Sequence, residues 1–454
     1  MKRQYFLFQL KIFLTNPKNV GLFFITVVLA LYFGLVSAPQ HHVIEDVDPY
    51  AISKEYQDDQ AFLKVAEKEF ARADKGTSDY DPSEGAKDAV TTYPTIIKYD
   101  HERLKALKNH DWRLYTKYSS KWYQKMDNLI WVKENQNYMY PLEYYHNNNY
   151  KEDGHFGYQR TFHFYDGLLK SKAKLDKNVL EERTTLQRLQ QSLSGWTMII
   201  LIVIVVLFAA DMITNDQKYR TVVKNIPLSK RTILWLKTAV IEVGILFNFL
   251  VAFLVVTLCT APRYGFGSFN LLTPIYTGRL YFKTPFVYQT LGQYYLGFLI
   301  FAVVITFIFI RLTLLLSLIF RNEYVAAIIS SVLAMSAKVL YFSLGMGFVY
   351  PFLKHLPMTY FTIGESLTSN LSYLMDSPGW DFNDGIIPLV TLAIVIELTI
   401  WLFCQFRKVV LGDCKIFCVR MNNSLNLFLK TLEKGVPFSY DWFEQKNTYR
   451  KKNS

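Results

Sequence analysis

Cysteine is scarce in this sequence of 454 residues, which contains only four. They lie at positions 259, 404, 414 and 418, so the polar segment from 39 to 195 has none and, if it lies outside the cell, folds without disulfides. Cys414 and Cys418 are four residues apart, but a zinc site would need two further ligands. We therefore expect a reduced, inert pair rather than a metal site.

Motifs for catalysis and cofactor binding are also lacking. The sequence has no Gly-x-x-x-x-Gly-Lys-Ser/Thr loop to cradle ATP phosphates and no Gly-x-Ser-x-Gly elbow to present a nucleophile. We assign no catalytic residue and no cofactor to this chain. If ATP drives its work, ATP and Mg must be bound by a separate subunit.

Histidine spacings typical of metal enzymes are missing as well. Seven of the eight histidines lie between 39 and 195, yet no pair has the His-Glu-x-x-His spacing that holds zinc beside a base. His41 and His42 precede Glu45 and Asp46, a group able to chelate a metal weakly, although a solvated linker explains them better. We predict no metal site.

Apolar and aromatic residues are abundant, at 51% and 16% of the chain, and the mean hydropathy is positive. This composition indicates a polytopic membrane protein. The net charge is +12, but residues 39 to 195 carry 23 basic and 25 acidic groups, so the positive excess lies elsewhere. That placement suits contact with the anionic lipid of a bilayer, and no nucleic-acid-binding motif is present.

Uncharged or nearly uncharged runs predict an α-helical membrane protein with six transmembrane helices. The predicted spans are 20–38, 196–210, 239–260, 294–320, 324–347 and 386–406. A basic, amphipathic elbow from 1 to 17 should lie in the membrane interface before the first span. Pro39 follows the small residues Val36-Ser37-Ala38 and should block signal-peptide cleavage there, so we expect the first helix to be retained.

The connector between the second and third spans, residues 215–237, sets the orientation. It contains six Lys or Arg and one acidic residue, and a short loop this basic stays on the cytoplasmic side. Six spans then place both termini in the cytoplasm, which suits a tail, 407–454, with ten basic and four acidic groups. We expect a multi-pass protein of a bacterial plasma membrane, with 1–38 as elbow and first span, 39–195 outside and 196–406 as the remaining spans.

The polar segment 39–195 reads as a mainly helical stalk-and-head domain. Residues 52–73 form one predicted helix, and apolar residues at alternating spacings of three and four predict a coiled-coil stalk from 166 to 193. No Gly or Pro interrupts it between Leu168 and Ser194, so we expect it to continue into the second span at Trp196. The aromatic head between these helices, 76–165, is either a core or a binding face for peptide or sugar.

Four ionisable residues lie within the predicted spans: Glu242, Arg311, Lys338 and Glu397. Glu242 and Arg311 are close enough to the cytoplasmic ends to reach the interface by snorkelling. Lys338 and Glu397 fall near mid-span at similar depths, where a charge is costly, so we predict that they form an ion pair. The alternative is that each lines a water-filled pathway.

Residues 350–361, before the last span, are too apolar for an ordinary loop and too rich in proline to span. Short re-entrant helices and an interfacial loop explain them equally well.

The connector also contains an ordered motif. Pro227 should end the preceding helix and Ser229 should cap the next one, which starts at about Lys230. With an acidic residue and a Thr before it and a Lys after it, this motif resembles the first cytoplasmic loop of type-2 ABC exporter permeases, although the family usually has Glu at position 216 and Gly where this chain has Arg220. In that family the loop packs against an ATPase subunit. The resemblance therefore implies an ATPase-coupling role for Asp216, Thr221, Pro227, Ser229, Arg231 and Lys237.

The resemblance implies the permease subunit of an ATP-driven exporter, which moves a peptide, lipid or antimicrobial-type substrate outward. Its partners would be an ABC ATPase and a second copy, or a related permease, in a dimer. A mechanotransmission permease also has a large outer domain but typically four spans. A membrane receptor or envelope-assembly factor, whose head binds a ligand, is the alternative outside transport, although six spans with charges inside them exceed what anchoring requires.

Overall fold

The computed structural model describes residues 1–41, 43–73, 81–135, 138–145, 150–214, 226–277, 286–339, 351–368, 370–374 and 381–410. The chain divides into two units, Met1–Ile396 and Glu397–Ser454. The described part of the second unit is the end of helix α17 (Phe382–Val410), which begins in the first unit. All other described elements belong to the first unit.

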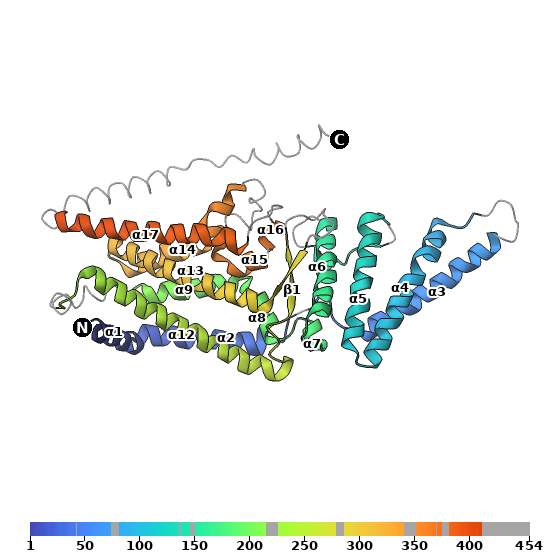
Figure 1. The fold of residues 1–454 in the computed structure, drawn as a ribbon, viewed down its shortest axis with the longest axis horizontal. Coiled ribbons are helices and arrows are strands. Elements are labelled where there is room, and N and C mark those ends of the chain that lie inside the picture. The colour runs from blue at the N-terminus through green and yellow to red at the C-terminus, as the bar shows by residue number, and fades with distance from the viewer. Residues whose placement is uncertain are drawn as a thin grey trace, which may run out of the picture. The chain divides into compact units, whose positions relative to one another are not determined.

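Apolar helices form a bundle in the first unit (Figure 1). Besides the start of α17, they are α1 (Lys2–Thr15), α2 (Pro17–Tyr32) with its π-helical end η1 (Phe33–Ser37), α9 (Trp196–Ala209), α12 (Lys230–Tyr264), α13 (Leu291–Phe320) and α14 (Glu323–Ala337). Helix α9 contacts α2, α12, α13 and α14, and most of its side chains are buried. It is therefore the central helix of the bundle.

Four of the six predicted spans coincide with helices long and apolar enough to cross a membrane: Pro17–Ser37, Lys230–Tyr264, Leu291–Phe320 and Phe382–Gln405. The second predicted span is α9, which has 14 residues and belongs to a bent helix pair. The fifth is α14, a shorter apolar helix, and residues 340–350 lie outside the described part. The described residues thus contain four candidate spans, or five with the bent pair, and six remains a prediction.

Polar side chains define where the bundle helices begin. The Asn16 side chain accepts the backbone N–H of Lys18 at 3.1 Å, and Pro17 occupies the first turn of α2, where its missing N–H costs nothing. Thr290 and Gln293 form a reciprocal capping box at α13, and Asn322 caps α14. These caps separate α1 from α2 and α13 from α14.

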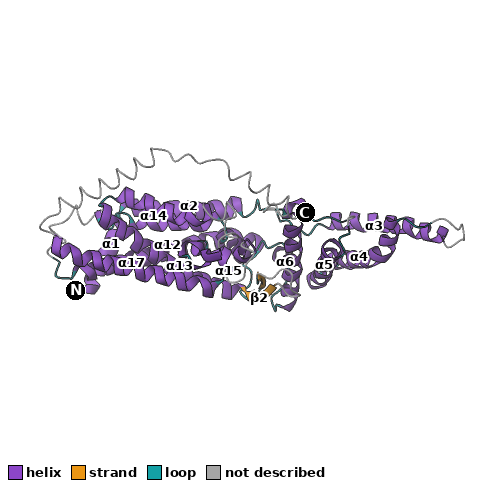
Figure 2. Cartoon of the chain, turned by 90° about the horizontal axis from the view of Figure 1, so that it is seen from above, coloured by secondary structure: helices purple, strands orange, loops and turns teal. Residues whose placement is uncertain are grey.

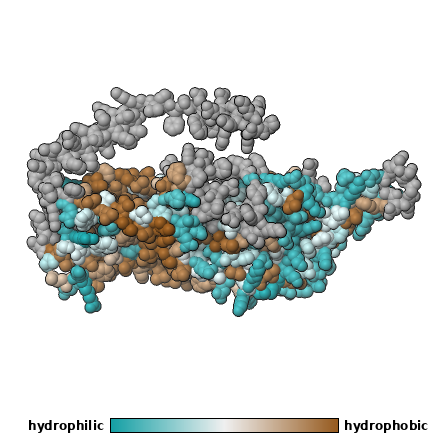
Figure 3. Space-filling view, turned by 45° about the horizontal axis from the view of Figure 1, so that its top comes forward, coloured by the Kyte–Doolittle hydropathy of each residue, from teal (hydrophilic) through white to brown (hydrophobic). Residues whose placement is uncertain are grey.

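A helical head lies at one end of the bundle, and Figure 3 shows hydrophilic residues gathered over it and hydrophobic residues over the bundle. Its elements are α3 (Pro49–Ala73), α4 (Glu84–Lys108), α5 (Trp112–Asp127), η2 (Asn128–Val132), η3 (Leu142–Tyr144) and α6 (Tyr150–Lys170). Consecutive long helices pack on one another, α3 on α4, α4 on α5 and α5 on α6. The predicted helix at 52–73 is confirmed as α3.

Aromatic residues of the head build its core. Tyr115 and Tyr165 are fully buried, and the Arg103 guanidinium lies 5.1 Å from the Trp122 ring centroid. Arg103 also pairs with buried Asp100 at 2.8 Å, so the cation is both paired and stacked. Of the two roles considered for the head aromatics, these residues therefore serve as core.

The predicted continuous stalk from 166 to 193 is wrong. Helix α6 ends at Lys170, and α7 (Lys177–Leu180) and α8 (Thr185–Leu193) follow as separate helices, with a bend of 70° between Lys177–Leu193 and Trp196–Ala209. Asp176 caps α7 through the N–H of Val179, and Glu182 adopts a left-handed φ of 51°, which stops a helix. Local side-chain caps and one backbone reversal interrupt the helix where no Gly or Pro does.

A two-stranded hairpin connects the head to the bundle (Figure 2). Strands β1 (Leu272–Tyr276) and β2 (Phe286–Thr290) pair antiparallel, with Leu272 opposite Thr290. The Tyr288 hydroxyl donates to the Asp166 carboxylate of α6 at 2.5 Å, and His163 contacts the same hydroxyl at 3.0 Å. The head is thus attached through α6 and the hairpin, in a region where the sequence predicted only a loop.

The apolar segment before the last predicted span folds into short helical pieces. They are η6 (Pro351–His355), η7 (Pro357–Phe361), α15 (Ile363–Leu367) and α16 (Asn370–Leu374). Tyr360 and Ile363 are fully buried, since η7 packs on α14 and α15 packs on α13. The segment is therefore part of the core of the first unit.

We expect the head to become more stable as the pH falls from about 8.5 to about 5.5. Burial raises the pKa of the Glu45 carboxyl to about 8, and burial together with Asp100 and Asp58 raises the pKa of Asp59 to about 6. Both exceed the ordinary values of 4.5 and 3.8. The folded head therefore holds protons that the unfolded chain releases, and this stabilisation is lost as the pH rises through about 6 and then about 8.

The measurement is the melting temperature of the purified full chain, followed by near-ultraviolet circular dichroism at several pH values. Glu45→Gln should remove most of the pH dependence, whereas Glu143→Gln, at an exposed glutamate, should leave it intact. A melting temperature that stays level over this range in the unmodified chain would contradict the assignment.

Candidate functional site

The connector residues with the coupling motif lie at the end of the bundle that contains the start of α12. Pro227, Ser229 and Arg231 are exposed, while Asp216 and Thr221 lie outside the described residues. Ser229 accepts the N–H of Thr232 at 3.2 Å and α12 begins at Lys230, which confirms the predicted cap and start. The described part of the connector therefore presents an exposed basic corner on a fixed helix end.

Lys237, the last residue of the motif, has a different position. It is buried, and its ammonium donates to the backbone carbonyl of Met212 at 3.2 Å. Met212 lies just beyond the C-terminus of α9, where backbone carbonyls have no helical partner. Lys237 thus connects the start of α12 to the end of α9.

Other side chains contact the same end of α9. Lys18 of α2 donates to the carbonyls of Leu207 at 2.8 Å and Phe208 at 3.4 Å, and Ser317 of α13 donates to the carbonyl of Ala210 at 3.4 Å. Cations at a helix C-terminus are favourable because the helix dipole places partial negative charge there. We name Asn16, Lys18, Lys237, Ser317 and Glu323 the α9 clamp.

Asp211 completes the arrangement from within. Its carboxylate forms an ion pair with Lys18 and accepts the Asn16 side-chain amide at 2.8 Å. Three residues later Thr214 donates to Glu323 at the start of α14. Residues 207–214 are therefore bonded to α2, α12, α13 and α14, directly before the connector begins.

The sequence did not identify the clamp. Asn16, Lys18 and Asp211 are polar residues at the edges of apolar runs, and such residues are usually solvated. A signal was present, since Asp211 is the first charge after 22 uncharged residues and Lys18, of opposite charge, lies at the edge of another uncharged run. Pairing charges at the ends of predicted spans would have suggested this contact.

Arg311 is buried inside the bundle, where α13 faces α12. It is 2% exposed, its guanidinium lies 4.8 Å from the Trp235 ring centroid, and it donates to Thr238 at 3.1 Å. Glu242, one turn further along α12, accepts the hydroxyl of Thr306 from α13. These contacts form a polar seam between α12 and α13.

Lys338 forms an ion pair with Glu365, which the sequence did not suggest. Both side chains are largely buried, and the Lys338 ammonium lies 6.0 Å from the Trp196 ring centroid at the start of α9. Glu365 belongs to the short helix α15, so the pair connects the end of α14 to the segment before α17. The pairing of Lys338 with Glu397 remains a prediction.

Together these contacts suit the transfer of mechanical force rather than bond chemistry. Among the described residues, no group of three or more His, Cys, Asp or Glu is placed to hold a metal ion. Charged side chains connect separate helices at both ends of α9. A displacement of the connector would therefore reach four other helices through the α9 clamp.

A family model described as "ABC-2 family transporter protein" matches residues 20–406. The matched range contains the connector and the polar seam. It also contains the α9 clamp apart from Asn16 and Lys18, which precede it. No curated protein and no solved structure matches the chain.

We expect Lys18 and Asp211 to be energetically coupled. Lys18→Met and Asp211→Asn should each lower the melting temperature of the purified chain in detergent. The double variant should be more stable than the sum of the two losses predicts, by on the order of 1 kcal/mol for a partly exposed pair. Lys230→Met, at an exposed lysine of the connector, is the matched control and should change little. Strict additivity of the two clamp changes would show that the pair contributes nothing.

A second cycle identifies the partner of Lys338. Lys338→Met and Glu365→Gln should each cost on the order of 2 kcal/mol because one buried charge is left unpaired, and the double variant should recover part of that loss. Thermal unfolding in detergent gives the energies. If Lys338→Met is instead coupled to Glu397→Gln and additive with Glu365→Gln, the predicted Lys338–Glu397 pair holds and the Glu365 pair does not.

Proposed function

Because the chain belongs to the ABC-2 family of transporter proteins, we propose that it is the permease subunit of an ATP-driven exporter. Membership makes it the transmembrane component of an ABC transporter, which is not itself an ATPase. In the proposed complex, ATP and Mg are bound by partner ATPase subunits, and the permease pairs with a second copy or a related permease. Its substrate is a peptide, a lipid or an antimicrobial-type molecule, moved outward across a plasma membrane.

The observation that supports coupling is how the connector is held at both ends. Residues 207–214, directly before it, are bonded to four helices by the α9 clamp, and the connector leads into α12, whose first turn is capped by Ser229. A displacement of the connector would act on the bundle through these two bonded ends. The exposed Pro227, Lys230 and Arg231 are the surface on which an ATPase would act.

The proposed cycle follows from these connections. An ATPase subunit that moves on binding ATP displaces the connector, and α9 and α12 tilt together because Lys237 joins them. Tilting of α9 changes its packing on α2, α13 and α14, which it contacts. In a dimer this motion opens the cavity between permeases outward. Both termini and the connector lie in the cytoplasm in this arrangement.

Reversing one exposed charge tests the contact. Arg231→Glu should reduce co-purification with the co-expressed ABC ATPase at least roughly fivefold, or uncouple ATP hydrolysis from transport, because a charge at the rim of an interface affects association. Arg263→Glu is the matched control, since Arg263 is also exposed but lies in the last turn of the same helix.

Membrane insertion and melting temperature should be the same for both variants. The coupling role of the connector fails if the complex and its coupled hydrolysis survive both Arg231→Glu and Pro227→Ala. Equal losses with Arg231→Glu and Arg263→Glu would also contradict it, because they would indicate a general charge effect.

A further inference from the structure

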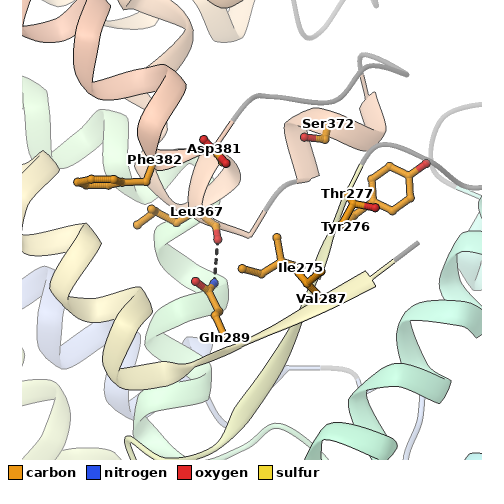
Figure 4. Close-up of a pocket in the computed structure, with 9 residues that line it drawn as sticks. All are labelled: Ile275, Tyr276, Thr277, Val287, Gln289, Leu367, Ser372, Asp381 and Phe382. Carbon is orange, nitrogen blue, oxygen red and sulfur yellow. Dashed lines mark hydrogen bonds between the residues drawn. The ribbon is translucent and has the colours of Figure 1, made fainter. Parts of the chain in front are cut away.

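A cavity of about 350 Å³ lies where the hairpin faces α15, α16 and the start of α17 (Figure 4). Its size is within the range of pockets that bind small organic molecules. It is separate from the α9 clamp and from the polar seam, and neither the sequence nor the family assignment gives it a role. The residues that decide its chemistry are Tyr276, Val287, Gln289, Leu367, Asp381 and Phe382.

Contacts with neighbouring elements fix the positions of residues that line the cavity. The Gln289 amide of β2 donates to the backbone carbonyl of Leu367 at 2.8 Å, which joins the hairpin to α15. On one side the Phe382 ring packs on Phe301 of α13, with centroids 4.9 Å apart. On the other, Tyr276 packs edge-on against Phe286 at 5.5 Å. Both aromatic residues are therefore held in place without a ligand.

Among the described residues that line the cavity, Asp381 is the one Asp or Glu, and none is Lys, Arg or His. One Asp381 oxygen accepts the backbone N–H groups of Asn383 and Asp384, at 2.9 and 3.2 Å, so the carboxylate is held at the start of α17. A second carboxylate, Asp153 of α6, is not among the residues that line the cavity and accepts the hydroxyl of Tyr373 on α16.

We propose that this cavity binds an amphipathic organic cation, with its ammonium beside Asp381 and its apolar part among Val287, Leu367 and Phe382. Asp381 should repel an anion of the same size, and a neutral analogue would lack the electrostatic attraction to this carboxylate. The proposal goes beyond the proposed function, because binding requires neither ATPase nor transport.

The test uses benzyltrimethylammonium and benzenesulfonate, two aromatic ions of opposite charge, and saturation-transfer NMR on the full chain in lipid nanodiscs. Empty nanodiscs give the background. The cation should bind and the anion should not. Asp381→Asn should raise the Kd of the cation roughly fivefold or more, a change of about 1 kcal/mol. Asparagine caps a helix as well as aspartate, so α17 should still begin normally.

Two further variants test whether the cation binds in the cavity or at another place on the protein. Asp384→Asn, three residues along the same helix and outside the lining, should leave the Kd unchanged within about twofold. Val287→Trp places a large side chain at a half-exposed strand position that tolerates it, and should abolish binding by filling the cavity. Equal binding of both ions, equal effects of Asp381→Asn and Asp384→Asn, or binding that survives Val287→Trp in a normally melting protein would each overturn the proposal.

Discussion

The backbone of α9 imposes the constraint on which the rest of the bundle depends. A helix of 14 residues rises about 21 Å, less than the roughly 30 Å of a hydrocarbon core. Because α9 is surrounded by α2, α12, α13 and α14, its end groups must be satisfied by protein. At one end Lys18, Ser317 and Lys237 bond the carbonyls. At the other the chain turns by 70° into α8, whose own C-terminal carbonyl at Gln190 accepts the Ser194 hydroxyl at 3.2 Å.

The turn at the head end of α9 is possible because α15 approaches it closely. A Cβ on Gly364 would lie 2.5 Å from the Leu193 carbonyl oxygen and 2.6 Å from the Ser194 nitrogen, so only glycine fits there. Lys338 and Glu365, the latter next to Gly364, pair beside the ring of Trp196. The bend before α9, the close contact of α15 and the largely buried ion pair are thus parts of one arrangement.

The sequence predicted those parts of the fold that depend on long apolar runs or on a single capping residue. Apolar runs predicted four long helices, and Ser229 predicted the start of α12 within a residue. Prediction from the sequence failed where the structure depends on contacts between residues distant in the sequence. The heptad-like spacing before Trp196 reads as one helix, but Asp176 and Glu182 divide it, and the leucines bury against the head core and the hairpin region instead of a coiled-coil partner. Similar depth in the predicted spans suggested Glu397 as the partner of Lys338. Glu365 was not considered, because the local sequence pattern does not show that it folds into the core.

The junction between β2 and α13 has a consequence for how the head responds to the bundle. Thr290 is both the last residue of β2 and the N-cap of α13, so strand and helix join without a linker residue. Two residues earlier, Tyr288 is bonded to Asp166 of α6. Rotation of α13 about its own axis therefore carries the hairpin with it and shifts α6. The head is coupled to a torsional motion of one helix, a degree of freedom distinct from the tilting that the connector imposes.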